Sequence, residues 1–300
     1  MFASSVLCLT ATGALAGNPT TIQIPPSCAN VSPGSPQANN LNTALKTALT
    51  AAVNPPNGGQ NGGLGFNMWA TVVANDGTVC AVAFTGANYK QQWLASRVIS
   101  AQKAATANSL SLGATTGSPN PGKLALSSAN LYSATRDGGS LFGLQFSNPV
   151  DPASAYLDSN GSQPDPTTFG TGSDPMIGRP IGGINVFGGG LAAFADNAAK
   201  VGGIGVSGDT SCTDHMVAWR LRRKSGLDYL ASAGVSGPAA LFAGDNGHPD
   251  NIIFDIPANA TSLVGNNGLS ASGFGHPTCL NNPPIDPNTK TAAGGLSPVE

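Results

Sequence analysis

Two short motifs in the second half of the chain place a cysteine three residues from a histidine. Cys212-x-x-His215 and His276-x-x-Cys279 are mirror images and contain two of the three histidines of the chain. Two thiolates and two imidazoles are a ligand set of tetrahedral zinc. A disulfide between Cys212 and Cys279 is the competing prediction, and we favour it because the chain has features of an exported protein. On either prediction the two segments are in contact.

The first of these motifs lies at the junction of a predicted strand and a predicted helix. An apolar, glycine-spaced run after Lys200 predicts a short buried strand, and a Ser-Gly-Asp turn follows it. A helix then begins near Thr213 and carries Asp214, His215 and a group of arginines. We expect the rest of the fold to position this strand, turn and helix.

The N-terminal residues 1–16 are predicted to be a signal peptide. They form an apolar run that ends in Ala14-Leu15-Ala16, which is typical of a cleavage site. The alternative is a buried strand or helix. We predict a secreted or periplasmic protein without membrane insertion after signal removal, since no other stretch approaches the roughly 18 apolar residues of a membrane helix.

Four cysteines remain after that segment, and an even number in an exported chain predicts two disulfides. They are Cys28, Cys80, Cys212 and Cys279, and four cysteines allow three pairings, which stay open here.

The composition is unusual in its lack of charge. Asp, Glu, Lys and Arg make up 9% of the residues, against about 25% in a typical soluble domain. A net charge of -2 gives no basic surface for nucleic acid. Because a surface with few charges repels its own copies weakly, we expect a homo-oligomer.

A glycine motif, Gly203-Ile-Gly205-Val-Ser-Gly208, matches the pattern of dinucleotide-binding sites. Its context excludes that interpretation, because the following segment 224–229 is polar and no strand–helix–strand unit surrounds the motif. We expect these glycines to permit close packing of backbone or ligand.

No catalytic motif is present, neither a nucleophile elbow nor a phosphate-binding loop nor a zinc-protease helix. Ser207 and Ser211 lie near His215 and Asp209 in sequence, but this spacing is too local for a catalytic triad. We therefore favour a protein that is not an enzyme.

The hydrophobic pattern predicts an α+β fold of three layers, with helices packed on a mostly antiparallel sheet. Helices are expected at 41–53, 91–107 and 124–136, and strands at 66–74, 78–84, 182–187 and 191–194, before the strand–turn–helix unit. The first two strands flank Asn75-Asp76-Gly77, a strong hairpin turn. An extended arm is expected at 17–37, a domain at 38–228, and an irregular C-terminal extension and tail at 229–300.

These elements carry a resemblance to a known family. The runs NMWATVVANDGTVCAVAF, QQWLASRVISAQKAATA, RPIGGINVFGGG and KVGGIGVSGDTSCTDHMVAWRLR, in this order, resemble the GlcG/HbpS-like haem-binding family, which includes the C-terminal domain of PduO-type proteins. The D-T-S-C-x-D-H and G-H-P-x-C segments resemble a longer, exported branch of it. The resemblance covers about residues 38–228.

The resemblance implies a profilin-like α/β/α fold with a five-stranded antiparallel sheet, an oligomer, and non-covalent haem binding. Some members bind haem through a histidine of the first helix, and residues 41–53 contain none. The expected axial ligand is therefore His215, with His276 second, and both are also the expected metal ligands. Haem propionates would pair with one of three arginines, Arg220, Arg222 or Arg136. The apolar wall of the pocket would come from Met68, Trp93 and Phe142.

The leading functional prediction is thus an exported, oligomeric haem- or tetrapyrrole-binding protein with a sensing, storage or carrier role. The alternatives are a structural subunit of an extracellular assembly or filament, an enzyme acting on a small organic acid or corrinoid, and a zinc protein.

Overall fold

The computed structural model describes residues 21–54, 61–113, 123–197, 199–232, 234–256 and 270–293. The predicted signal peptide lies outside the described residues. No helix within these ranges is both long and apolar enough to span a membrane.

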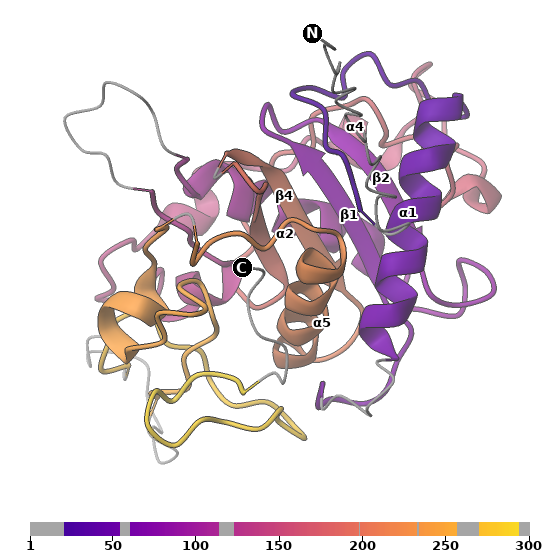
Figure 1. The fold of residues 1–300 in the computed structure, drawn as a ribbon. Helices are drawn as coiled ribbons and strands as arrows, with labels where there is room; N and C mark the ends of the chain where they lie inside the picture. Colours follow the sequence, from indigo (N-terminus) through magenta and orange to yellow (C-terminus); the bar gives the residue numbers. More distant parts are fainter. Residues whose placement is uncertain are drawn as a thin grey trace, which may run out of the picture.

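One antiparallel sheet of four strands forms the centre of the fold (Figure 1). Its strands lie in the order β2-β1-β4-β3 and comprise Trp69–Ala74 (β1), Val79–Phe84 (β2), Gly190–Phe194 (β3) and Lys200–Ser207 (β4). The predicted hairpin between β1 and β2 is confirmed, with Gly77 in the left-handed conformation (φ 84°) that the turn requires. All of β1, β2 and β3 is buried.

Helix α2 (Ser96–Leu110) packs closely on the sheet because β4 presents glycines to it. A Cβ atom at Gly205 would lie 1.9 Å from the carbonyl oxygen of Ser100, and one at Gly203 would lie 2.3 Å from that of Ala104. Thr71 of β1, opposite Gly205, completes the contact through a 2.8 Å hydrogen bond with the Ser100 hydroxyl. The glycine motif therefore serves close backbone packing, as predicted.

Helices α1 (Pro36–Val53) and α5 (Ser211–Lys224) contact each other and lie in front of the strands in Figure 1. The predicted apolar stripe of α1 is buried at Leu45, Ala48 and Leu49. The helix begins five residues earlier than predicted, because Pro36 occupies its first turn and the Ser35 side chain accepts the N–H of Ala38.

The α+β class and the antiparallel pairing are confirmed, but the expected five-stranded sheet is wrong for the described residues, where the sheet has four strands. The predicted strand 182–187 makes only an isolated bridge, between Gly182 and Val150. Gly182 (φ 64°) and Gly183 (φ 87°) are left-handed, and this backbone cannot continue an extended ladder. The three-layer arrangement stays a prediction.

Two predicted helices are shorter than their hydrophobic patterns indicated. The segment 124–136 forms a 3-10 turn, Ser128–Asn130, and the short helix α3, Leu131–Ala134. A capping box between Ser127 and Asn130 sets the start of this unit. Helix α2 begins at Ser96 and not near residue 91, since the side chains of Gln91 and Gln92 accept the N–H groups of the preceding loop.

The remaining elements are short. The loop 147–180 contains α4 (Pro152–Tyr156) and the 3-10 turn Pro166–Thr168, and a further 3-10 turn, Leu144–Phe146, precedes it. The C-terminal extension contains a π-helical turn, Ala239–Ala243, and isolated bridges such as that between Ile253 and Thr291. As Figure 1 shows, its orange and yellow segments lie beside one end of α5.

Candidate functional site

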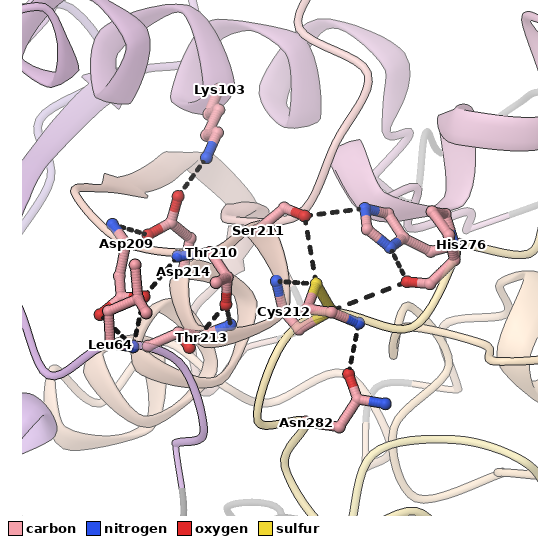
Figure 2. Close-up of a disulfide and its surroundings, with 12 residues drawn as sticks. Leu64, Lys103, Asp209, Thr210, Ser211, Cys212, Thr213, Asp214, His276 and Asn282 are labelled. Carbon is pink, nitrogen blue, oxygen red and sulfur yellow. Dashed lines mark hydrogen bonds and ion pairs between the residues drawn. A yellow bond between two sulfur atoms is a disulfide. The ribbon is translucent and has the colours of Figure 1, made fainter.

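The N-terminus of α5 gathers most of the polar residues that the sequence singled out (Figure 2). Thr210 caps the helix by accepting the N–H of Thr213 at 3.3 Å. Asp209, just before the cap, accepts the N–H groups of Leu64 and Phe66 at about 3.0 Å and so holds the loop that leads into β1. The helix therefore starts at a fixed position against this loop.

A buried ion pair links this helix to α2. The Nζ atom of Lys103 lies 2.7 Å from a carboxylate oxygen of Asp214, and it also donates to the carbonyl oxygen of Val206 at 3.3 Å. The ring of Phe187 covers the ammonium group, with its centroid 4.5 Å from Nζ. Burial raises the pKa of Asp214 to about 6, although the Lys103 ammonium opposes the shift. Burial also lowers the pKa of Lys103.

His276 of the C-terminal extension faces the first turn of α5. Its Nδ1 atom lies 2.7 Å from the carbonyl oxygen of Pro277, and its Nε2 atom lies 3.1 Å from the hydroxyl of Ser211. Since a carbonyl oxygen only accepts, Nδ1 carries the proton and Nε2 accepts from Ser211. Burial lowers the pKa of His276 to about 4, so the ring is neutral at pH 7.

Two disulfides are present, as predicted. One joins Cys28 to Cys80 and thereby ties the N-terminal arm to β2. The other joins Cys212 to Cys279 and ties the C-terminal extension to α5, which confirms that the two Cys–His motifs are in contact. The Sγ atoms of Cys212 and Cys279 and a ring nitrogen of His276 lie within 4.8 Å of one another.

His215, the other predicted ligand, is almost completely buried and points to a different neighbour. Its Nε2 atom accepts the backbone N–H of Ile252 at 3.2 Å. Burial lowers the pKa of His215 to about 3. Both predicted histidines are therefore neutral, and as placed each Nε2 atom already has a hydrogen-bond partner.

The other predicted cofactor-binding residues lie apart from this cluster. Met68 is buried beside Gly208, and Arg220 donates to the side chain of Asn61. Trp93 is half exposed and packs edge-to-face on Phe66.

Two further predicted residues have other surroundings. Arg136 stacks on Tyr132, whose ring in turn lies 5.1 Å from that of His276. Arg222 is buried in ion pairs with Asp228 (2.7 Å) and Asp250 (2.5 Å). The guanidinium that was expected to bind haem propionates is therefore already paired with these two carboxylates.

The sequence did not predict the apolar groove beside the start of α2. This cavity, of about 790 Å³, is lined by residues of 89–98 and 156–169, among them Tyr89, Leu94, Tyr156 and Phe169. Arg97 forms part of its wall, with its guanidinium 4.1 Å from the centroid of the Phe169 ring. The available signal was the aromatic side chains on both segments, but no periodicity joins segments about 60 residues apart.

No family model matches the chain, and no curated protein matches it. Among the solved structures that resemble it, two do so over about three fifths of its length. The first, Klebsiella pneumoniae protein ORFY of family-model DUF336, is 22% identical, with a TM-score of 0.36 over 61% of this chain and 88% of its own. The second, the PduOC–heme complex, is 15% identical, with a TM-score of 0.35 over 62% of this chain and 93% of its own.

The chain is thus similar to GlcG/PduO-like proteins, as its sequence indicated.

Proposed function

We propose that the protein binds a planar, largely apolar small molecule of the tetrapyrrole class, with haem as the first candidate, in the groove beside α2. The observation that carries this proposal is the groove itself. Its volume of about 790 Å³ lies within the usual range of small-molecule sites, roughly 300–1,000 Å³. Aromatic and aliphatic side chains dominate its lining, as they do in such sites.

The wall of the groove is rigidly supported. Arg97 donates from Nε to a carboxylate oxygen of Asp174 at 2.8 Å and from a terminal nitrogen to the carbonyl oxygen of Ala155 at 3.1 Å. Both members of the Arg97–Asp174 pair are buried, and Phe169 stacks on the guanidinium. A flat ring system entering the groove would meet a surface fixed by these contacts, which lowers the entropic cost of binding.

Two phenols are among the polar groups of the groove. Tyr89 and Tyr156 line it, and Tyr156 is 58% exposed. A tyrosine oxygen is one of the established axial ligands of haem iron. These phenols would hold the iron, and the cofactor would supply the redox chemistry when bound.

The groove is a better candidate than the predicted histidines. A histidine binds haem iron through a free nitrogen lone pair, whereas Nε2 of His215 accepts from Ile252 and Nε2 of His276 accepts from Ser211. Ligation by either one requires a hydrogen bond to break in a buried environment.

A haemin titration of the purified chain tests the proposal. The chain is compared with the variants Tyr89→Phe, Tyr156→Phe and Phe169→Ala, and with Tyr229→Phe as a control outside the groove. We expect a saturable Soret shift in the parent chain. The affinity for haemin obtained from it should fall at least about tenfold in a groove variant and stay unchanged in the control. A shift that survives all three groove variants but is lost in His215→Gln or His276→Gln would contradict the groove assignment. No saturable shift in the parent chain would contradict haem binding.

We also propose export and self-association. Two disulfides support an oxidising compartment. The low charge, together with exposed Phe142 (62%) and Phe146 (79%), supports contact between copies. Light scattering on the purified chain, with Phe142→Ser/Phe146→Ser as a variant, tests it. A monomer at all concentrations would contradict both the oligomer and the alternative role as a subunit of an extracellular assembly.

A further inference from the structure

The Cys212–Cys279 disulfide lies against a histidine whose ring is already oriented as a metal ligand. The two sulfur atoms and a nitrogen of His276 lie within 4.8 Å of one another. No other group of three histidine, cysteine or acidic residues in the described part of the chain meets this criterion. We propose that reduction of this disulfide by a dithiol opens a site for a divalent metal ion, zinc above all, with Cys212, Cys279 and His276 as its ligands.

The orientation of His276 is the first argument. Metal-ligating histidines almost always donate their second ring N–H to a carboxylate, a carbonyl or water, which fixes the tautomer and the direction of the free lone pair. Here Nδ1 donates to the carbonyl oxygen of Pro277 at 2.7 Å, and the Nε2 lone pair points to the Ser211 hydroxyl at the disulfide. The ring is thus held in the tautomer that ligates through Nε2, and a metal ion bound there would replace the hydrogen bond from Ser211.

The surroundings of the sulfur atoms are the second argument. Sγ of Cys279 lies 3.2 Å from the backbone nitrogen of Cys212, which can donate to it, and 3.5 Å from the Ser211 hydroxyl oxygen, whose one proton goes to His276. The donating N–H belongs to the first turn of α5, a 14-residue helix whose N-terminus favours negative charge. Hydrogen bonds and a helix N-terminus stabilise thiolates, the form in which cysteine binds metal.

The redox step balances with a dithiol as reductant. One thiolate of the dithiol attacks the partly exposed Sγ of Cys279, breaks the bond between the two sulfurs and releases the Cys212 thiol. The second thiol of the reductant then displaces Cys279, so two electrons pass to the protein and the reductant leaves as a cyclic disulfide. Metal binding releases the two thiol protons. The Ser211 hydroxyl or a water completes four-coordination.

The second disulfide is an internal control. Cys28 and Cys80 are completely buried, and within the described part of the chain no histidine or acidic residue joins them in a group of three possible metal ligands. The backbone N–H of Cys28 is bonded to the Thr78 hydroxyl, and Sγ of Cys80 lies 3.7 Å from the carbonyl oxygen of Thr78. Reduction there yields two thiols without a third ligand.

Cobalt(II) titration of the full chain under anaerobic conditions tests the proposal, with and without prior reduction by dithiothreitol. We expect the reduced chain to bind one cobalt ion with sulfur-to-metal charge-transfer bands and the visible bands of a tetrahedral site, and zinc to displace it. The oxidised chain should show neither set of bands. Circular dichroism of the same samples reports whether the reduced chain stays folded.

Variants locate the site. His276→Ala should weaken the affinity for cobalt by at least about tenfold, since even the loss of a residue that hydrogen-bonds to a metal ligand weakens the affinity that much. Cys212→Ser/Cys279→Ser should abolish the charge-transfer bands, whereas Cys28→Ser/Cys80→Ser should keep them. A reduced chain that unfolds or takes up no cobalt overturns the proposal, as do bands that persist in Cys212→Ser/Cys279→Ser. Because the readout is cobalt and not haem, its failure leaves the groove proposal unaffected.

Discussion

Lys103 of α2 and Asp214 of α5 form an ion pair, 2.7 Å apart, that is almost completely shielded from solvent. A buried ion pair is expensive to form, and removal of one partner leaves the other charge without compensation. The ammonium also contacts the Val206 carbonyl and the face of Phe187, and neither carries a charge. The stability of the helix junction should therefore depend on both members.

Replacement of Lys103 by methionine should destabilise the protein in a pH-dependent way. The pKa of Asp214 is already raised to about 6, and loss of the ammonium that opposes this shift raises it further. A carboxyl group with a raised pKa favours the folded state when it is protonated. Its contribution to stability is therefore complete below about pH 3.8, the unfolded-state pKa, and is lost as the pH rises through the folded-state pKa. We expect Lys103→Met to cost about 3–5 kcal/mol of unfolding free energy at pH 7.5 and clearly less at pH 5.

Urea unfolding at the two pH values, each relative to the parent chain, measures this difference. Lys90→Met, which removes an exposed lysine, is the matched control and should change the unfolding free energy little at either pH. An equal deficit of Lys103→Met at both pH values would show that Asp214 does not titrate as inferred.

The C-terminal extension should depend on Arg222. Its guanidinium pairs with Asp228 at 2.7 Å and, through two nitrogens, with Asp250 at 2.5 and 3.0 Å, and all three residues are buried. Arg222→Met leaves two carboxylates without a counter-ion, and we expect a loss of about 3–5 kcal/mol. Arg222→Lys should recover only part of it, because an ammonium cannot reproduce the bidentate contact.

Chemical unfolding, together with limited proteolysis of the extension, measures this effect. Asp250→Asn should be destabilising, whereas Asp137→Asn, at an exposed position, should not be. Equal stability of Arg222→Met and the parent chain would refute the network as a structural element.

The sequence was sufficient to predict features that depend on local signals. The Asp76-Gly77 hairpin, the glycine-spaced strand and the contact of the two Cys–His motifs are all confirmed. The prediction of a strand at 182–187 was wrong because this segment begins with two glycines whose φ is positive. A hydrophobic pattern contains no information on backbone dihedrals. The groove could not be predicted, since its walls come from segments that only the tertiary fold brings together.

The side chain of Arg222 illustrates the same limit for the candidate site. Its position on α5 suggested a propionate ligand, but Asp228 and Asp250 occupy it. Asp250 lies 28 residues away in an irregular segment, and no periodicity connects it to the helix. Ion pairs of this kind depend on tertiary contacts and not on spacing.

The Cys28–Cys80 disulfide should stabilise the fold by tying the N-terminal arm to β2. It closes a loop over 52 residues of sequence, and both of its cysteines are buried. We expect Cys28→Ala/Cys80→Ala to lose about 2–5 kcal/mol, mainly because the unfolded chain gains conformational freedom. Thermal and urea unfolding without reductant measure the loss. A double variant as stable as the parent chain would contradict a stabilising role.

His215 should remain neutral down to about pH 4 and make the fold sensitive to acid. Burial lowers its pKa from 6.5 to about 3, and Nε2 must stay unprotonated to accept the N–H of Ile252. A group with a depressed pKa contributes stability at pH values above its unfolded-state pKa. This contribution decreases as the pH drops below about 6.5 and is lost once the pH passes through the folded-state pKa. His215→Gln keeps an acceptor but cannot titrate. Between pH 7.5 and 4.5 the parent chain should therefore lose about 1–3 kcal/mol more unfolding free energy than the variant. Urea unfolding at both pH values checks this, and an equal loss in the two chains would mean that His215 is protonated, or its ring exposed, in the folded protein.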